Sequence, residues 1–220
     1  MIELKKRIIT SIFLIILLYL MYIYNYILII SLIVISLIVW IEFFGIILKI
    51  FYKNDLKNKI YRHFFKGLSL IYLSLLSFLI IFIFINQNDF KFFAIYSFLV
   101  AIASDIGGIL FGKFFKGRKL TKISPKKTIS GSIGSFVFSM LLIFIFSKNF
   151  ENYSFMKVIF FTVSISLISQ IGDLFISYLK RKAKVKDTSN TLPGHGGFLD
   201  RVDGIIFALP YGIYMSKILF

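Results

Sequence analysis

The chain has 220 residues, of which 58% are hydrophobic and 16% charged, and its formal net charge is +16. A soluble domain carries roughly 25% charged residues and cannot bury repeated apolar runs of bilayer length, so this composition excludes a soluble fold. Cysteine is absent, which excludes disulfides and thiolate metal sites. The basic residues lie between the apolar runs, where anionic lipid headgroups account for them, and we expect no nucleic acid partner.

Seven apolar runs predict membrane-spanning helices. In chain order their approximate bounds are 8–24, 27–47, 67–85, 92–112, 129–147, 156–178 and 204–219. The first run follows three basic residues, as in a signal peptide, but it lacks a small-residue cleavage site and is long enough to span, so we expect it to be retained. The sequence therefore predicts an all-α integral membrane protein, a polytopic bundle of about seven transmembrane helices. Within this one continuous membrane domain, residues 1–100 form N-terminal helices and residues 101–220 a catalytic region.

Positive charge alternates from loop to loop. The N-terminus and the loops after the second, fourth and sixth runs are rich in Lys and Arg, whereas the other loops carry few. Because cytoplasmic loops are enriched in these residues, we expect the N-terminus and the basic loops to face the cytoplasm. The prediction is a multi-pass protein of the cell (inner) membrane with a site that faces the cytoplasm.

Two of the ten acidic residues lie inside apolar runs. A charged side chain at the centre of a spanning helix costs roughly 2.5–3.5 kcal/mol, so Asp105 and Asp173 indicate a functional site more than a polar residue satisfied by a neighbouring helix. Glu42, near the end of the second run, fits an interfacial structural carboxylate equally well.

The sixth run carries a polar stripe. Gln170, Asp173, Ser177 and then Lys180 with Arg181 recur at helical spacing and share one helix face. A carboxylate at one end of the stripe and two cations at the other suit a polyphosphate bound with a metal ion.

The loop after this run is rich in chemistry. Its segments read Lys186-Asp187, His195-Gly196-Gly197 and Asp200-Arg201-Val202-Asp203. The glycines allow a ligand to approach the backbone closely, and Asp200 and Asp203 would share a helical face. If each residue is considered alone, Asp203 can be interpreted as the N-cap of the last helix and His195 as an ordinary loop histidine. Together with Asp173 they predict a hard-cation and phosphate site, for which Mg²⁺ is the default ion.

A second group of polar and small residues surrounds the preceding basic loop. It contains Asp105, Gly107, Gly108 and Gly112, the segment Ser124-Pro125-Lys126-Lys127-Thr128, and then Gly131, Gly134 and Ser135. Small residues at this spacing permit close packing of two helices in lipid, and they also leave room for a nucleotide. Lys126 and Lys127 are either phosphate ligands or ordinary cytoplasmic charge.

The stretch from Ser177 to Asp203 reads S-x-L-K-R-x4-K-D-x7-H-G-G-x2-D-R-x-D. It resembles the signature of the phosphatidate cytidylyltransferase family without a gap. Ser124 to Thr128, Asp105 to Gly112 and Trp40-Ile41-Glu42 are also similar to family segments. Two departures are Ser130, where the family usually has glutamate, and an N-terminal region shorter than is typical.

The resemblance implies transfer of a cytidylyl group from CTP to phosphatidate, a membrane lipid, as a step of phospholipid biosynthesis. It implies Asp173 and Asp200 as ligands of Mg²⁺, with or without K⁺, and a homodimer. The catalytic residues would be Asp173, Asp200, Lys180, Arg181 and Asp203. Substrate binding would involve Lys126, Lys127, Ser177, Lys186, Asp187, His195, Gly196, Gly197, Arg201 and Asp105.

Two other functions remain open. A CTP-dependent lipid-alcohol kinase acting on a polyprenol or phytol would use the same nucleotide but release CDP. An ion transporter would use Asp105 and Asp173 as a cation path, although the inverted repeat expected of such a protein is not evident in the sequence.

Overall fold

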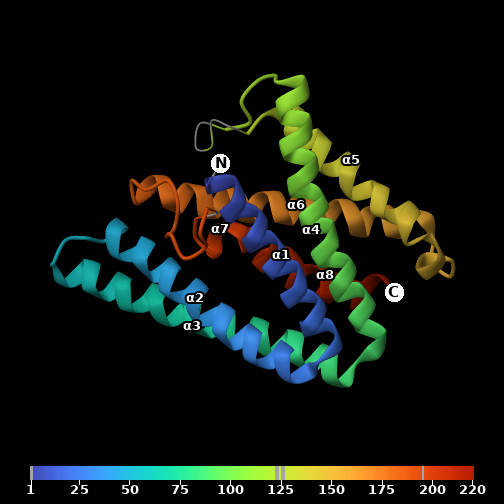
Figure 1. Ribbon diagram of the computed structural model, residues 1–220, viewed down its shortest axis with the longest axis horizontal. Coiled ribbons are helices and arrows are strands. Elements are labelled where there is room, and N and C mark those ends of the chain that lie inside the picture. The colour runs from blue at the N-terminus through green and yellow to red at the C-terminus, as the bar shows by residue number, and fades with distance from the viewer. Residues whose placement is uncertain (1, 122–123, 125–126, 195) are drawn as a thin grey trace. The chain divides into compact units, whose positions relative to one another are not determined.

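The computed structural model describes the backbone of residues 2–121, 124, 127–194 and 196–220, with the side chains of these residues except 2–6, 88 and 89. In these ranges the chain forms helices and two isolated β-bridges, with no strand (Figure 1). The long helices are α1 (Ile2–Ile23), α2 (Asn25–Ile50), α3 (Leu56–Asn86), α4 (Asn88–Phe115), α5 (Ile129–Ile145), α6 (Phe155–Lys182) and α8 (Ile205–Leu219). The 3₁₀ helix η1 (Ser147–Phe150) and the single turn α7 (Leu199–Val202) complete the described elements. Each predicted run coincides with a helix, so the predicted all-α fold is confirmed.

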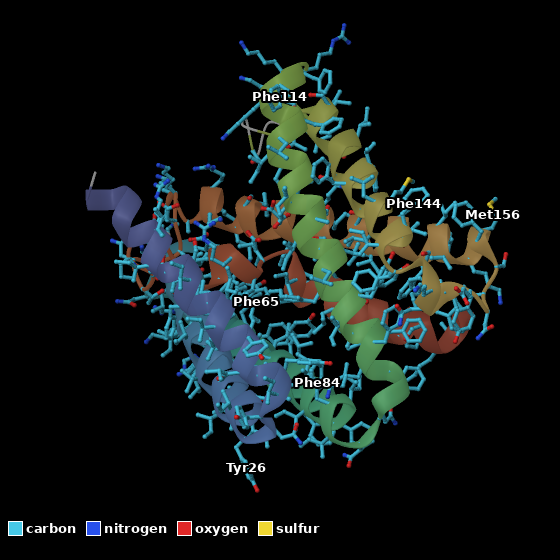
Figure 2. The ribbon with its side chains drawn as sticks, turned by 45° about the vertical axis from the view of Figure 1, so that its right-hand side comes forward. Tyr26, Phe65, Phe84, Phe114, Phe144 and Met156 are labelled. Carbon is cyan, nitrogen blue, oxygen red and sulfur yellow. The ribbon has the colours of Figure 1, made fainter. Side chains whose placement is uncertain are left out.

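Among the described residues, five segments are long and apolar enough to cross a bilayer. They are Asn25–Ile50, Leu56–Asn86, Phe90–Phe115, Phe155–Lys182 and Leu199–Leu219, and two shorter apolar helices cover Arg7–Ile23 and Ile129–Ile145. Large apolar side chains on these helices point away from the protein, as Figure 2 shows for Phe114 and Phe144, which are 81% and 70% exposed. Such surfaces are stable in lipid, where a helix also satisfies its own backbone groups. The chain is a polytopic membrane protein.

The chain divides into two compact units. Unit 1 consists of residues Met1–Gln87 and Leu179–Val202, and unit 2 of residues Asn88–Tyr178 and Asp203–Phe220. Helix α6 therefore contributes most of its length to unit 2 and its last residues, from Leu179 on, to unit 1. The functional division near residue 100 that the sequence suggested stays a prediction.

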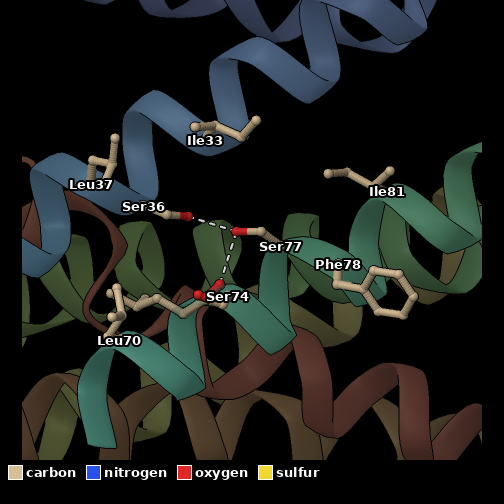
Figure 3. A pocket seen from close by; sticks show the side chains of 9 residues that line it. Ile33, Ser36, Leu37, Leu70, Ser74, Ser77, Phe78 and Ile81 are labelled. Atoms are coloured by element: carbon tan, nitrogen blue, oxygen red, sulfur yellow. Dashed lines mark hydrogen bonds between the residues drawn. The ribbon is translucent and has the colours of Figure 1, made fainter. Parts of the chain in front are cut away.

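In unit 1, α2 packs against α1, α3 and α7. A groove of about 280 Å³ lies along α2 and α3 and is lined mostly by aliphatic side chains (Figure 3). Within it the hydroxyls of Ser36 and Ser77 form a hydrogen bond of 2.6 Å, which satisfies both groups in an apolar setting. Nearer the end of α2, the indole N–H of Trp40 donates to the carbonyl oxygen of Lys66 at 3.0 Å. The Lys66 ammonium lies 5.3 Å from the centre of the Trp40 ring, a cation–π contact.

In unit 2, α4 packs against α5 and α8. Its core is aromatic: Tyr96 and Phe161 are fully buried and stack with ring centres 5.9 Å apart. The Tyr96 hydroxyl is paired with that of Thr162 at 2.7 Å, so the buried phenol keeps a hydrogen bond.

Glycines bring α4 and α5 into backbone contact. A Cβ atom added at Gly134 would collide with the Phe111 side chain and lie 2.8 Å from the carbonyl oxygen of Gly107, and one at Gly131 would lie 2.8 Å from that of Gly108. Of the two interpretations left open for these residues, close helix packing is the one that the structure shows.

Candidate active site

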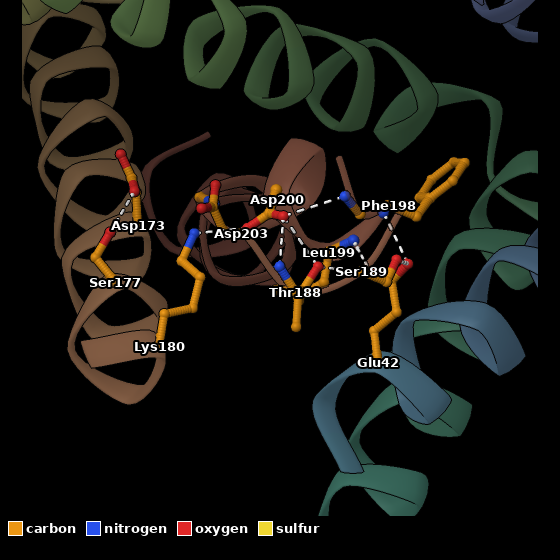
Figure 4. A network of polar contacts seen from close by, with 12 residues as sticks. Glu42, Asp173, Ser177, Lys180, Thr188, Ser189, Phe198, Leu199, Asp200 and Asp203 are labelled. Carbon is orange, nitrogen blue, oxygen red and sulfur yellow. Dashed lines mark hydrogen bonds and ion pairs between the residues drawn. The ribbon is translucent and has the colours of Figure 1, made fainter. Parts of the chain in front are cut away.

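The loop between α6 and α7 holds Asp200 in a fixed orientation. Its Oδ1 accepts a hydrogen bond of 2.6 Å from the Lys180 ammonium, at the end of α6 (Figure 4). Its Oδ2 accepts from the backbone N–H of Thr188 at 2.8 Å, the Thr188 hydroxyl at 3.0 Å and the N–H of Gly197 at 3.2 Å. The two charged side chains are only 12% and 10% exposed. One carboxylate oxygen is thus committed to the loop, and the other faces a cation.

Two neighbouring glycines let the loop adopt this shape. Gly196 has φ +84°, a conformation that residues with a Cβ rarely adopt. A Cβ atom at Gly197 would lie 2.7 Å from a carboxylate oxygen of Glu42 and would overlap the Thr188 hydroxyl. The backbone at these glycines approaches side chains of the same unit, and their predicted approach to a ligand stays a prediction.

Glu42 of α2 is a further carboxylate of unit 1, and it is 4% exposed. It accepts hydrogen bonds from three hydroxyls, those of Thr188 at 3.0 Å, Ser189 at 2.6 Å and Thr191. It also accepts from the backbone N–H groups of Phe198 at 3.0 Å and Leu199 at 2.7 Å. These five donors all come from the α6–α7 loop and the start of α7, so Glu42 fastens this loop to α2.

In unit 2, Asp173 forms an ion pair with Lys127, which precedes α5. Asp173 Oδ1 also accepts a hydrogen bond of 3.3 Å from Ser177, one turn later on α6, as the helical spacing predicted (Figure 4). The Lys127 and Asp173 side chains are 27% and 22% exposed, so water and ligands can reach this pair. Thr128 caps α5 by accepting from the N–H of Gly131 at 3.1 Å, which fixes the segment that carries Lys127.

Further polar side chains precede Asp173 on α6. The Gln170 carbonyl oxygen accepts a hydrogen bond of 2.5 Å from Ser132 of α5, and the Gln170 amide contacts Ser166 at 3.5 Å. Ser130, at the position where a glutamate was expected from the resemblance, donates to the carbonyl oxygen of Lys116 at 2.5 Å. Its hydroxyl therefore ties the start of α5 to the preceding loop.

The other predicted site residues differ in exposure. Arg181, Lys186, Asp187 and Arg201 are exposed, and Asp105 is half-buried on α4. Asp203 is 6% exposed and accepts from the backbone N–H of Gly204 at 2.9 Å, just before α8. Lys126 and His195 lie outside the described residues. The roles predicted for all of these side chains stay predictions.

The donor atoms fit a hard cation. Carboxylate and hydroxyl oxygens are the ligands that Mg²⁺ prefers, and Asp173 and Asp200 each offer a carboxylate beside a hydroxyl. Because two backbone N–H groups donate to Oδ2 of Asp200 and the Thr188 hydroxyl lies 3.0 Å from it, Oδ1 is the oxygen left to bind an ion in exchange for Lys180. In the part of the chain that the structure describes, no three His, Asp or Glu side chains gather at a metal site. A single carboxylate beside a hydroxyl, as each unit offers, is compatible with an ion that takes most of its ligands from water and substrate phosphates, as Mg²⁺ does.

Sequence reasoning missed most of the partners of these carboxylates. It assigned Lys127 to nucleotide phosphates and did not foresee its pairing with Asp173. It left Glu42 undecided and gave no role to Thr188, Ser189 or Thr191. The concentration of small hydroxyl residues in an otherwise basic loop was the available signal, because such side chains often hydrogen-bond a nearby acid.

The chain is similar to known proteins along its length. The sequence model described as "Cytidylyltransferase family" matches residues 1–219. A protein of Rickettsia felis named phosphatidate cytidylyltransferase is 43% identical over 127 residues, which cover 54% of this chain and 56% of that relative. Relatives of the same name from Staphylococcus haemolyticus and Helicobacter pylori are both 38% identical, covering 57% and 50% of this chain and 49% and 41% of their own lengths. The chain thus spans about half the length of the curated relatives it matches.

Proposed function

We propose that this chain, which belongs to the cytidylyltransferase family, transfers the cytidylyl group of CTP to phosphatidate and so makes CDP-diacylglycerol and pyrophosphate. The observation that carries the proposal is the Asp200–Lys180 pair, which stands in the segment with the family's signature and holds a carboxylate oxygen whose one described partner is a lysine that a ligand can displace. The relatives named phosphatidate cytidylyltransferase support the same reaction.

The reaction needs positioning and charge neutralisation more than covalent chemistry. A phosphate oxygen of phosphatidate attacks the α-phosphorus of CTP and forms a new P–O bond. The bond from this phosphorus to the oxygen that bridges to the β-phosphate breaks, and that oxygen leaves with pyrophosphate. No nucleophile from the protein is required, so Ser177 is proposed as a support for Asp173.

Basic residues would bind the phosphates of both substrates. A lysine ammonium is a compact charge on a flexible stem, so Lys180 and Lys127 can turn from their aspartates to an incoming phosphate. Arg181 and Lys186 are exposed and available for the same purpose. Asp173 and Asp200 are the proposed metal ligands, and Mg²⁺, with or without K⁺, would supply positive charge to offset the triphosphate when bound.

We also propose that the N-terminus and the basic loops face the cytoplasm, in the cell (inner) membrane, because their Lys and Arg content exceeds that of the alternate loops. A homodimer, which the resemblance implies, is part of the same proposal, and light scattering of the detergent-solubilised chain would measure it.

The test uses purified full-length chain with phosphatidate in mixed micelles, Mg²⁺ and CTP labelled either in the cytosine ring or at the γ-phosphate. We expect ring label in the lipid phase together with released pyrophosphate, no reaction without phosphatidate, and loss of reaction with EDTA that added Mg²⁺ restores. Transfer of the γ label alone to a polyprenol supplied in place of phosphatidate, with release of CDP, would contradict the proposal and support a lipid kinase.

A further inference from the structure

We propose that Glu42 is a positioning residue that orients Asp200 through Thr188. The proposal rests on the function proposed above, in which Asp200 is a metal ligand of the active site. Glu42 is buried on α2, and its five hydrogen-bond donors come from one loop and the helical turn that follows it. A buried carboxylate is costly unless it is fully hydrogen-bonded, so this arrangement fixes the loop more firmly than apolar packing alone would.

Thr188 connects the two carboxylates. Its hydroxyl lies 3.0 Å from Glu42 Oε2 and 3.0 Å from Asp200 Oδ2, while its backbone N–H donates to the same Oδ2 at 2.8 Å. A threonine hydroxyl carries a single proton and can donate to only one carboxylate at a time. Since Glu42 also fixes Leu199, the residue before Asp200, it holds the aspartate from both sides. Oδ2 thereby stays turned toward the loop, and Oδ1 is the oxygen presented to Lys180 and to a ligand.

The network requires a carboxylate at position 42 and would not accept an amide. Oε1 accepts the backbone N–H of Phe198 and Oε2 that of Leu199. A glutamine has the same shape, but in either orientation its NH₂ group would face one of these N–H donors, which cannot reverse. A hydroxyl partner could rotate to accept, whereas a backbone N–H cannot. Glu42→Gln is therefore a specific disruption that leaves the packing volume of α2 unchanged.

The adjacent loop residues match this role. Gly197 brings the backbone so close that a Cβ there would lie 2.7 Å from Glu42 Oε2. Three residues before Gly197 in the chain, the Gly194 carbonyl oxygen accepts a hydrogen bond of 2.9 Å from Arg7 of α1. Helices α1 and α2 thus both hold the loop. Glu42 bonds to its buried end at Leu199, and Arg7 bonds to the exposed Gly194.

The experiment compares Glu42→Gln, Thr188→Val and Thr188→Ser with the unaltered full-length chain in detergent. Glu151→Gln is the matched control, because it makes the same chemical change at an exposed position. The first measurement is the rate of tryptic cleavage after Lys184 and Lys186, two exposed residues of the loop, followed by mass spectrometry. Cleavage of this kind reports how often the loop opens. The second is kcat and KM for CTP.

For Glu42→Gln and Thr188→Val we expect cleavage about 10-fold faster and kcat lower by about 10- to 100-fold, the usual effect of losing a group that orients a ligand. The KM for CTP should change far less, because the phosphate-binding cations are untouched. Thr188→Ser and Glu151→Gln should match the unaltered chain. The double variant should lose no more than the stronger single variant, since both changes break one connection.

Normal kcat in Glu42→Gln, or a normal kcat in Thr188→Val beside an impaired Glu42→Gln, would overturn the proposal. If Glu42→Gln does not yield folded protein, the Thr188→Val and Thr188→Ser pair decides, because valine keeps the volume and serine keeps the hydroxyl. The cleavage measurement does not depend on activity. If the unaltered chain shows no cytidylyl transfer, the proposed function is contradicted. If the loop of the Glu42→Gln variant is nevertheless cleaved faster than that of the unaltered chain, the anchoring of the loop by Glu42 is supported.

Discussion

At the residue scale, the carboxylates of this protein are held by partners that are distant in sequence. Lys180 and Asp200 are little exposed, and removing one member of such a pair leaves the other charge without compensation. Lys127 and Asp173 form a more accessible pair, for which water screens part of the attraction. The two pairs therefore differ in how strongly a neutral substitution should act.

We predict that Asp200→Asn lowers the rate of cytidylyl transfer by about 100-fold, as expected when a charge that stabilises a reacting phosphate is lost. Asparagine keeps the shape of the side chain, but it offers no charge to Lys180 or to a metal ion. The rate of appearance of lipid-soluble cytidine label measures the effect. Asp55→Asn, at an exposed residue in the α2–α3 loop, is the control and should be fully active. Full activity of Asp200→Asn would remove this residue from the site.

Sequence spacing predicted some of these contacts and could not predict others. The Asp173–Ser177 hydrogen bond follows from a separation of four residues on one helix, which alone brings two side chains together. The contacts of Glu42 with Ser189 and Leu199 join residues about 150 positions apart, and no local periodicity reports such a contact. The signature from Ser177 to Asp203 indicated which residues matter, but it did not indicate what holds them.

At the element scale, hydropathy predicted every long helix and misjudged where several of them end. Helix α3 begins at Leu56, whereas the predicted run began near residue 67. The added turns contain Lys57, Lys59 and Arg62, so a hydropathy criterion omits them although they continue the same hydrogen-bonded helix. Apolar length reports the part of a helix that suits lipid, and capping decides where the helix begins and ends.

The contact of α4 with α5 depends on glycine, and we predict that Gly134→Ala destabilises the protein. The new methyl group would meet the Phe111 side chain and the Gly107 carbonyl group, and overpacking of this kind costs about 1–3 kcal/mol. The melting temperature in detergent should fall by several degrees. Gly67→Ala on α3 is the control, because a Cβ there meets nothing within 4 Å and alanine favours helix. An equal effect of the two substitutions would contradict close packing at Gly134.

At the scale of the whole molecule, the alternation of basic loops predicts on which side of the membrane each loop lies. Lys57 follows α2 and Lys184 follows α6, both in basic segments, whereas Glu151 lies in the poorly charged link before α6. Lys and Arg retain loops in the cytoplasm far more strongly than acidic residues export them. Loop charge therefore carries information about the whole chain that no single helix contains.

We predict that cysteines introduced as Lys57→Cys and Lys184→Cys react with a membrane-impermeant maleimide only when it has access to the cytoplasmic face, and that Glu151→Cys reacts from the opposite face. The chain has no cysteine of its own, so each variant reports a single position. Intact cells and inverted membrane vesicles give the two directions of access. Labelling of Lys57→Cys and Glu151→Cys from one and the same side would contradict the predicted orientation.

The contact between Trp40 and Lys66 has a practical consequence for spectroscopy. Trp40 is the only tryptophan of the chain, and it stands on α2 two residues before Glu42. Its indole N–H is hydrogen-bonded and its ring lies beside an ammonium group, so its emission should respond to any change in this part of unit 1. The protein thus carries a natural fluorophore on the same helix as the residue that fastens its loop, and ligand titrations could follow that fluorophore without an added dye.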